Sequence, residues 1–271
     1  MSLFDGVGEI IDKQLGIDET WGGTPPRYRH SSALLRMKKD NLPNGGRLVS
    51  SLFGQLMKNW GESGCPVASS GQNWRFSKQI NFQDVPRAPE VPLERTIASI
   101  TDSSWANHIP VNSGLLGDPA KCLDLACRAD DIVELIELRV IAATPLSAAI
   151  EILSYGLANA FFRINRHRIL PATSPGELLV AKELHLRVLA PLTYYERFAE
   201  VAHWLNAFES CLDQGVKIFS AKCRNPDYVK ISEFRFQVFP ASFTWDQTLH
   251  FDVSHRRELV NAVELRRCLF A

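Results

Sequence analysis

The segment from Pro145 to about Arg166 constrains the fold of this chain more than any other, because it is apolar on nearly every side. Thr144 suits the position that caps a helix, and Pro145 suits the first helical turn, so the segment is predicted to be a helix. A helix that is apolar nearly all round is buried on several sides. The rest of the chain must therefore supply elements that pack around it.

The patterns on either side of this helix predict the surrounding elements. Strand-like patterns occur at 122–128, 132–141, 183–190, 216–221 and 231–239. Helices are predicted at 6–15, 46–60, 93–106 and 193–213, with Gly215 ending the last of them. The first two strands are close enough to form an antiparallel hairpin, and the later order of strand, helix and strand implies a parallel pair. We therefore predict an α/β fold with a mixed β-sheet flanked by helices.

A change in composition near residue 92 divides the chain into two parts. Apolar residues make up 45% of the 271 residues, which is enough for a sizeable core. Residues 1–92 are rich in Gly, Pro, Ser and Asn, and are predicted to be an N-terminal extension packed on a core domain of residues 93–271. Three prolines between Pro86 and Pro92 predict an extended approach to a helix that begins near Leu93.

Charge and cysteine content exclude several classes of protein. The 30 basic and 30 acidic residues cancel, which argues against a broadly basic nucleic-acid binder but not against a local basic groove. No signal peptide or long apolar run is visible, so we expect a soluble, cytoplasmic protein without membrane contact. The six cysteines lack metal-ligand spacing and are expected to be reduced and structural.

Two acids and an arginine within the predicted hairpin are the strongest candidates for chemistry. If Arg128 pairs with Val133, Asp124 lies directly opposite Glu137, and Arg139 shares their face of the sheet. A two-residue loop of Ala129 and Asp130 would instead place Asp124 diagonal to Glu137 on the same face. Two carboxylates so close repel each other unless a cation lies between them. A magnesium ion is one answer, with the carbonyl of Leu138 as a further ligand. An ion pair between Arg139 and one of the acids is the other.

The spacing of these residues resembles the PD-(D/E)XK nuclease superfamily. Asp124, twelve intervening residues and then Glu137-Leu138-Arg139 are similar to its acid and Glu-x-Lys elements, which lie on a β-hairpin followed by a buried helix. Residues 144–157 fit that helix, and the resemblance spans about residues 90–190, with weaker support to 245.

A bacterial branch of this superfamily shows two further similar stretches. They are Trp-Ala-Asn and Ser-Gly-Leu-Leu-Gly before the acidic strand, which stand here at 105–107 and 113–117. The resemblance implies a restriction-endonuclease-like core.

The resemblance also implies metal-dependent hydrolysis of a phosphodiester, with DNA a better candidate substrate than RNA. Asp124 and Glu137 would hold magnesium or manganese, and Glu94 is the candidate third acid, with Glu90 as the alternative. Arg139 stands at the usual lysine position. Arginine stays protonated and cannot act as a general base, although it can stabilise developing negative charge.

That departure from the superfamily pattern leaves two further possibilities open. The chain could be a catalytically degenerate module that keeps the nuclease fold and binds nucleic acid or protein. It could also be a structural subunit with no nucleic-acid role.

Three other groups of residues have both a functional and a structural interpretation. Glu151 and Tyr155 share a helix face and either border the active site or form an internal hydrogen-bonded pair. Two basic clusters either contact a nucleic-acid backbone or are ordinary helix-end and surface charges; they are Arg163, Arg166, His167 and Arg168, and Arg27, Arg29, Arg36, Lys38 and Lys39.

Overall fold

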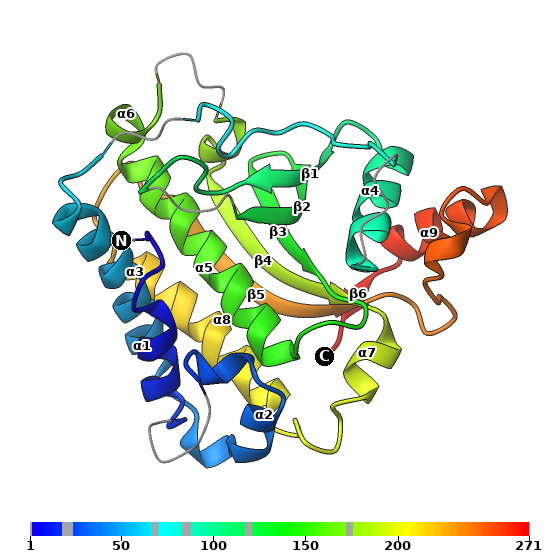
Figure 1. The fold of residues 1–271 in the computed structure, drawn as a ribbon, viewed down its shortest axis with the longest axis horizontal. Helices are drawn as coiled ribbons and strands as arrows, with labels where there is room; N and C mark the ends of the chain where they lie inside the picture. The colour runs from blue at the N-terminus through cyan, green and yellow to red at the C-terminus, as the bar shows by residue number, and fades with distance from the viewer. Residues whose placement is uncertain are drawn as a thin grey trace.

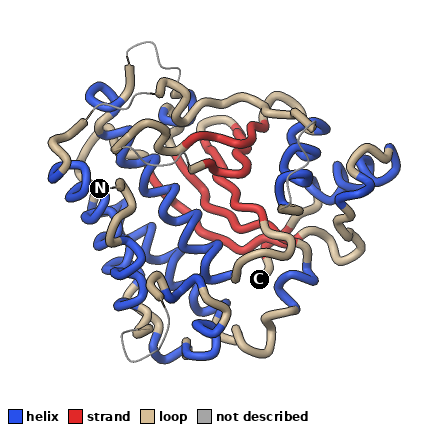
Figure 2. The backbone as a smooth tube through the Cα atoms, in the orientation of Figure 1, coloured by secondary structure: helices blue, strands red, loops and turns tan. Residues whose placement is uncertain are grey.

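A six-stranded mixed sheet forms the centre of the protein (Figure 2). The computed structural model describes residues 2–17, 24–66, 70–82, 88–116, 121–171 and 176–270. The strands lie in chain order across the sheet: β1 (Trp105–Pro110), β2 (Cys122–Ala129), β3 (Ile132–Leu138), β4 (Glu183–Ala190), β5 (Lys230–Val238) and β6 (Arg267–Cys268). Neighbouring strands are parallel at β3–β4 and β4–β5 and antiparallel elsewhere. The predicted α/β class with a mixed sheet is confirmed.

Of the two hairpin registers that the sequence allows, β2 and β3 adopt the one that places Asp124 opposite Glu137. Arg128 pairs with Val133, and the connecting turn is shortened to Asp130 and Asp131 because Ala129 pairs with Ile132. Asp130 adopts a positive φ of 53°, a conformation that aspartate tolerates well in turns. An even number of turn residues keeps opposed side chains on the same face, so the hairpin aligns its two acids.

Helix α5 (Pro145–Ile164) connects β3 to β4 and is the buried helix predicted from its composition. The side chain of Thr144 accepts a hydrogen bond from the Ser147 N–H at 3.1 Å and so caps the helix as expected. Figure 1 shows α5 lying across one face of the sheet. The β3–α5–β4 unit is the predicted parallel crossover.

The prediction of a helix at 193–213 followed by a strand at 216–221 is wrong. The chain forms a short helix α7 (Leu192–Glu196) and then α8 (Leu205–Lys222), which continues through Gly215 and includes residues 216–221. Gly215 is needed inside the helix because a Cβ there would lie 2.6 Å from the backbone carbonyl carbon of Gly45. This close crossing of α8 with α3 (Gly45–Glu62) is a tertiary contact, and local sequence does not reveal it.

The N-terminal segment packs on the same core as the sheet. Helices α1 (Val7–Gln14) and α3 confirm the helices predicted at 6–15 and 46–60. Short elements connect them: η1 (Arg27–Arg29), α2 (Ser32–Arg36) and η2 (Lys39–Asn41). Buried residues of these elements belong to one hydrophobic cluster with α5 and the sheet. An edge-to-face contact of 5.4 Å between Trp60 and Phe161 illustrates this packing.

The opposite side of the sheet is covered by α4 (Glu90–Ile100) and α9 (Val253–Glu264), which lie together in Figure 1. Helix α4 begins at Glu90 rather than Leu93, because Pro89 precedes it and Pro92 fits its first turn. It ends at Ile100, so the predicted helix at 93–106 is too long, and Trp105 begins β1 instead. Pro86, Arg87 and Gly117 lie outside the described residues.

The remaining short helices are α6 (Arg166–Ile169), η3 (Glu177–Leu179) and η4 (Gln247–Leu249). Within the described ranges, no helix combines the length and apolar character that crossing a membrane requires.

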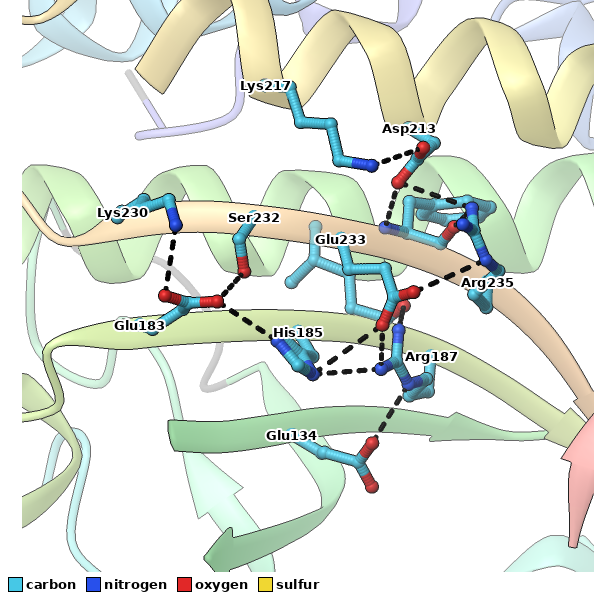
Figure 3. A network of polar contacts seen from close by, with 12 residues as sticks. Glu134, Glu183, His185, Arg187, Asp213, Lys217, Lys230, Ser232, Glu233 and Arg235 are labelled. Atoms are coloured by element: carbon cyan, nitrogen blue, oxygen red, sulfur yellow. Dashed lines mark hydrogen bonds and ion pairs between the residues drawn. The ribbon is translucent and has the colours of Figure 1, made fainter. Parts of the chain in front are cut away.

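A network of ion pairs lies on the sheet face that carries α4 and α9 (Figure 3). The buried Arg187 forms ion pairs with Glu134, at 3.0 Å, and with Glu233. Arg266 binds the second carboxylate oxygen of Glu134 at 2.7 Å, and Arg235 contacts Glu233 at 3.4 Å. Since each acid in this group is paired with arginine, the network serves to tie strands β3, β4 and β5 together.

Candidate active site

Asp124 and Glu137 lie opposite each other where β2 and β3 run under α5. The pairing of Leu125 with Ile136 makes Asp124 and Glu137 the next opposed pair. The Leu138 N–H donates to Asp124 Oδ2 at 2.8 Å, which fixes the orientation of this carboxylate. The Asp124 side chain is 22% exposed and that of Glu137 is 4% exposed. The hairpin therefore brings together the two acids expected from the sequence at a site that solvent can reach.

Arg139 contacts every acid of this site. Its guanidinium lies 2.6 Å from Glu137 Oε1, 2.7 Å from Glu151 Oε2 and 3.8 Å from Asp124 Oδ2. It also donates a hydrogen bond to the Leu138 carbonyl oxygen at 2.8 Å. The ion pair expected from the sequence is present, and it extends to a third carboxylate on α5.

One arginine does not neutralise this cluster. Burial raises the pKa of Asp124 to about 6, although Arg139 and the Leu138 N–H oppose the shift. Burial and repulsion from Asp124 raise the pKa of Glu137 well above its usual range. The raised pKa values of both acids indicate that one arginine leaves excess negative charge at the site, which a further cation would neutralise.

The second carboxylate oxygen of Glu137 also indicates that the site would accommodate a further cation. Glu137 Oε2 is buried and has no hydrogen-bond partner among the described residues. Two carboxylates and the Leu138 carbonyl present oxygen atoms, the ligand type that Mg²⁺ prefers. No group of three or more His, Cys, Asp or Glu side chains in the described part of the chain is arranged to hold a metal. The Asp124 carboxylate and the unpartnered Glu137 Oε2 fit an ion that takes its other ligands from water and substrate phosphate, as magnesium commonly does.

Glu94, the candidate third acid, lies near Asp124 but bonds to another residue. Its Oε1 accepts a hydrogen bond from Asn107 Nδ2 at 2.8 Å, and both residues are buried. Burial and the charge of Asp124 raise the pKa of Glu94 well above its usual range. Asn107 belongs to the Trp-Ala-Asn stretch noted above, so that stretch holds Glu94 in place.

Glu90, the alternative third acid, holds the loop after β3. Its Oε1 accepts hydrogen bonds from the N–H groups of Val140, Ile141 and Ala142, at 3.1, 3.2 and 3.1 Å. Burial opposes ionisation of Glu90, but these bonds outweigh it and lower the pKa. The carboxylate oxygen that makes these bonds therefore supports the segment directly after Arg139 and has a structural role.

Glu151 and Tyr155 satisfy both interpretations of their spacing. The Tyr155 hydroxyl donates to Glu151 Oε1 at 2.9 Å, while Glu151 Oε2 binds Arg139. Burial, followed by the charges of Glu137 and Glu151, raises the pKa of Tyr155. The pair thus forms an internal hydrogen bond and also borders the acid cluster.

A pocket of about 220 Å³ adjoins the acid cluster on the side of α5. Glu151 and Tyr155 form part of its wall, and residues of the N-terminal segment form much of the rest. Arg29 lines the pocket, which gives one member of the N-terminal basic run a place near the site. Lys121 and Ser147 also line it, and neither is among the site residues expected from the sequence. Ser147 lies one turn before Glu151 on the same helix face, and this spacing is the signal in the sequence that points to it.

The other basic cluster lies elsewhere. Arg163, Arg166 and His167 line a separate cavity of about 590 Å³. Arg163 is twelve residues beyond Glu151 on α5, which corresponds to roughly 18 Å along the helix. These charges therefore do not face the acid pair.

Comparison with models of protein families, with curated proteins and with solved structures finds no significant match to this chain.

Proposed function

We propose that this protein is a metal-dependent phosphodiester hydrolase that acts on nucleic acid, with DNA favoured over RNA. The observation that carries the proposal is the opposed pair Asp124 and Glu137, whose negative charge Arg139 leaves incompletely neutralised. Two opposed acids whose pKa values are raised by burial are well suited to exchange protons for a divalent cation. The resemblance to the PD-(D/E)XK nucleases supports the same chemistry.

Asp124, Glu137 and the carbonyl of Leu138 would hold the metal, and magnesium or manganese fits these oxygen ligands. When bound, the metal polarises a phosphoryl oxygen and lowers the pKa of water. The Arg139 guanidinium is held at the site by Glu151 and is positioned to stabilise negative charge that develops on the phosphate. Glu94 remains a candidate third acid beside Asp124.

Calorimetric titration of Mn²⁺ or Mg²⁺ into wild type and Asp124→Ala tests the proposal. Wild type should release or absorb heat on binding, and the variant should not, since it lacks one of two carboxylates. Asp130→Asn is a matched control, because it removes a carboxylate from the exposed turn of the same hairpin and Asn tolerates the positive φ there. Absence of heat with wild type would remove the hydrolase proposal.

A specific observation favours a second candidate, the catalytically degenerate module that binds nucleic acid or protein. The Arg139 guanidinium contacts Asp124, Glu137 and the Leu138 carbonyl, which are the three groups assigned to the metal. An arginine that replaced the metal permanently would make the same contacts. In that case the protein would bind a mixed-sequence DNA duplex without metal heat and without cleaving it.

A further inference from the structure

The pocket beside the acid cluster is built by two segments far apart in the sequence. Residues 4–9, at the start of α1, and Pro26, Tyr28 and Arg29 of the following turn form one part of the wall. Residues of α5 form the other part and include Glu151, which binds Arg139. The N-terminal segment therefore contributes directly to the surroundings of the proposed reaction centre.

A buried aspartate on α1 fixes the turn that carries Arg29. Asp12 is 3% exposed, and its carboxylate accepts hydrogen bonds from the N–H groups of Arg27 at 2.6 Å and Tyr28 at 2.8 Å. The turn also packs closely on α1, because a Cβ at Gly8 would lie 2.6 Å from Pro26 Cβ. These contacts hold the backbone next to Arg29 in one position.

Two cations accompany the carboxylates of this pocket. Arg29 is exposed, and its guanidinium lies 5.8 Å from the centre of the Tyr28 ring. The ammonium group of Lys121 lies 4.3 Å from the centre of the Phe4 ring. Arg29 lines the pocket together with Glu151, the acid of the cluster that binds Arg139.

A nucleic-acid strand at this site needs such a cation. A phosphate held at Asp124 and Glu137 has neighbouring phosphates on the same strand, which the pocket acids Asp5, Glu9 and Glu151 would repel. The planar guanidinium of arginine binds a phosphate through two parallel hydrogen bonds. Arg29 is exposed, is fixed at its backbone and lines the pocket beside Glu151, so it meets this requirement.

We propose that Arg29 is a substrate-positioning residue that binds a backbone phosphate of the nucleic acid next to the phosphate at Asp124 and Glu137, and that Asp12 holds Arg29 in place. This inference rests on the proposed function, since it takes the same class of substrate. It assigns the N-terminal segment a role in binding that the resemblance to a nuclease core does not supply.

The test measures DNA binding without metal, so that it does not depend on hydrolysis. Fluorescence anisotropy with a labelled, mixed-sequence DNA duplex is recorded in EDTA over a series of salt concentrations. Arg29→Gln should weaken binding about tenfold and reduce the slope of log K against log salt by about 0.9, the value for one phosphate contact. Arg47→Gln is the matched control, because Arg47 is an exposed arginine of α3 that lines a different cavity.

Two further variants separate charge from position. Arg29→Lys should restore the salt slope because it keeps the charge, while affinity stays below that of wild type because the second hydrogen bond is lost. Asp12→Asn keeps every cation and should still weaken binding, because asparagine has one acceptor oxygen in place of two and its amide nitrogen cannot accept the second N–H bond. If Asp12→Asn does not fold, the two Arg29 variants decide the question.

The outcomes separate this inference from the proposed function. The assignment of Arg29 would be overturned if wild type did not bind DNA in EDTA. It would also be overturned if Arg29→Gln bound DNA as tightly as Arg47→Gln, whatever the metal titration shows. DNA binding that depends on Arg29 without any metal heat would support Arg29 as a phosphate-binding residue and overturn hydrolysis alone.

Discussion

Replacing Asp124 with asparagine should stabilise the protein at alkaline pH, although it removes a residue of the proposed active site. Asparagine has nearly the same shape, and its Oδ1 can still accept the hydrogen bond that the Leu138 N–H donates to Asp124 at 2.8 Å. Asparagine carries no charge, so the repulsion between Asp124 and Glu137 disappears. Functional residues often lower the stability of a protein, so replacing one of them is expected to raise the unfolding free energy.

The magnitude follows from the pKa of Asp124, which burial raises to about 6. An aspartate in an unfolded chain titrates near about 3.9, so between these values the folded protein holds a proton that the unfolded chain has released. The unfolding free energy therefore falls as pH rises through this window, by about 3 kcal/mol in total. Between pH 4 and pH 8 we expect a loss of roughly 2 kcal/mol from this group, and Asp124→Asn should not show it.

Urea denaturation in EDTA at pH 4 and pH 8 measures this difference. The two proteins should have similar unfolding free energies at pH 4, and the variant should be the more stable by about 2 kcal/mol at pH 8. Asp130→Asn on the exposed turn should follow wild type at both values. A variant that is less stable than wild type at pH 8 would refute the reasoning, because Asp124 would then be well accommodated as an anion.

Two further predictions concern the arginine of the site and the helix crossing. Arg139→Lys should raise metal-dependent cleavage of a mixed-sequence DNA substrate if Arg139 limits catalysis, and unchanged cleavage with an intact fold would count against that role. Gly215→Ala should lower the unfolding free energy by about 1 to 3 kcal/mol, because its Cβ would lie 2.6 Å from the backbone of Gly45. The control Gly54→Ala meets no atom within 4 Å and should instead stabilise α3 by about 1 kcal/mol, so equal effects of the two changes on urea denaturation would contradict the close crossing.

Sequence patterns among residues that are close together in the chain correctly predict the centre of the fold. Thr144 and Pro145 define the start of α5, and the apolar composition of the helix reflects burial on several sides. The strands of the hairpin are connected by a two-residue turn, so their register follows from a few adjacent residues. The opposition of Asp124 and Glu137 could therefore be predicted before the structure was known.

The predictions from the sequence are wrong where a contact between segments far apart in the chain decides the local structure. Gly215 looks like a helix end in the sequence, but α8 continues through it, and the crossing with Gly45 of α3 leaves no room for a side chain at that position. Among the acids before β1, Glu90 binds the loop after Arg139, whereas Glu94 bonds to Asn107. The spacing of these acids along α4 does not indicate which of them faces which partner.

The sequence by itself determined the α/β class, the buried helix and the pairing of the two acids, because each depends on hydrophobic periodicity or on residues within one hairpin. Only the tertiary structure decided that Arg139 contacts three carboxylates and that Arg29 lines the pocket beside them. Arg29 reaches that pocket because Asp12 holds its turn against α1 and η1 packs on α5. The contact of η1 with α5 joins segments more than a hundred residues apart, and the packing of the whole core brings them together.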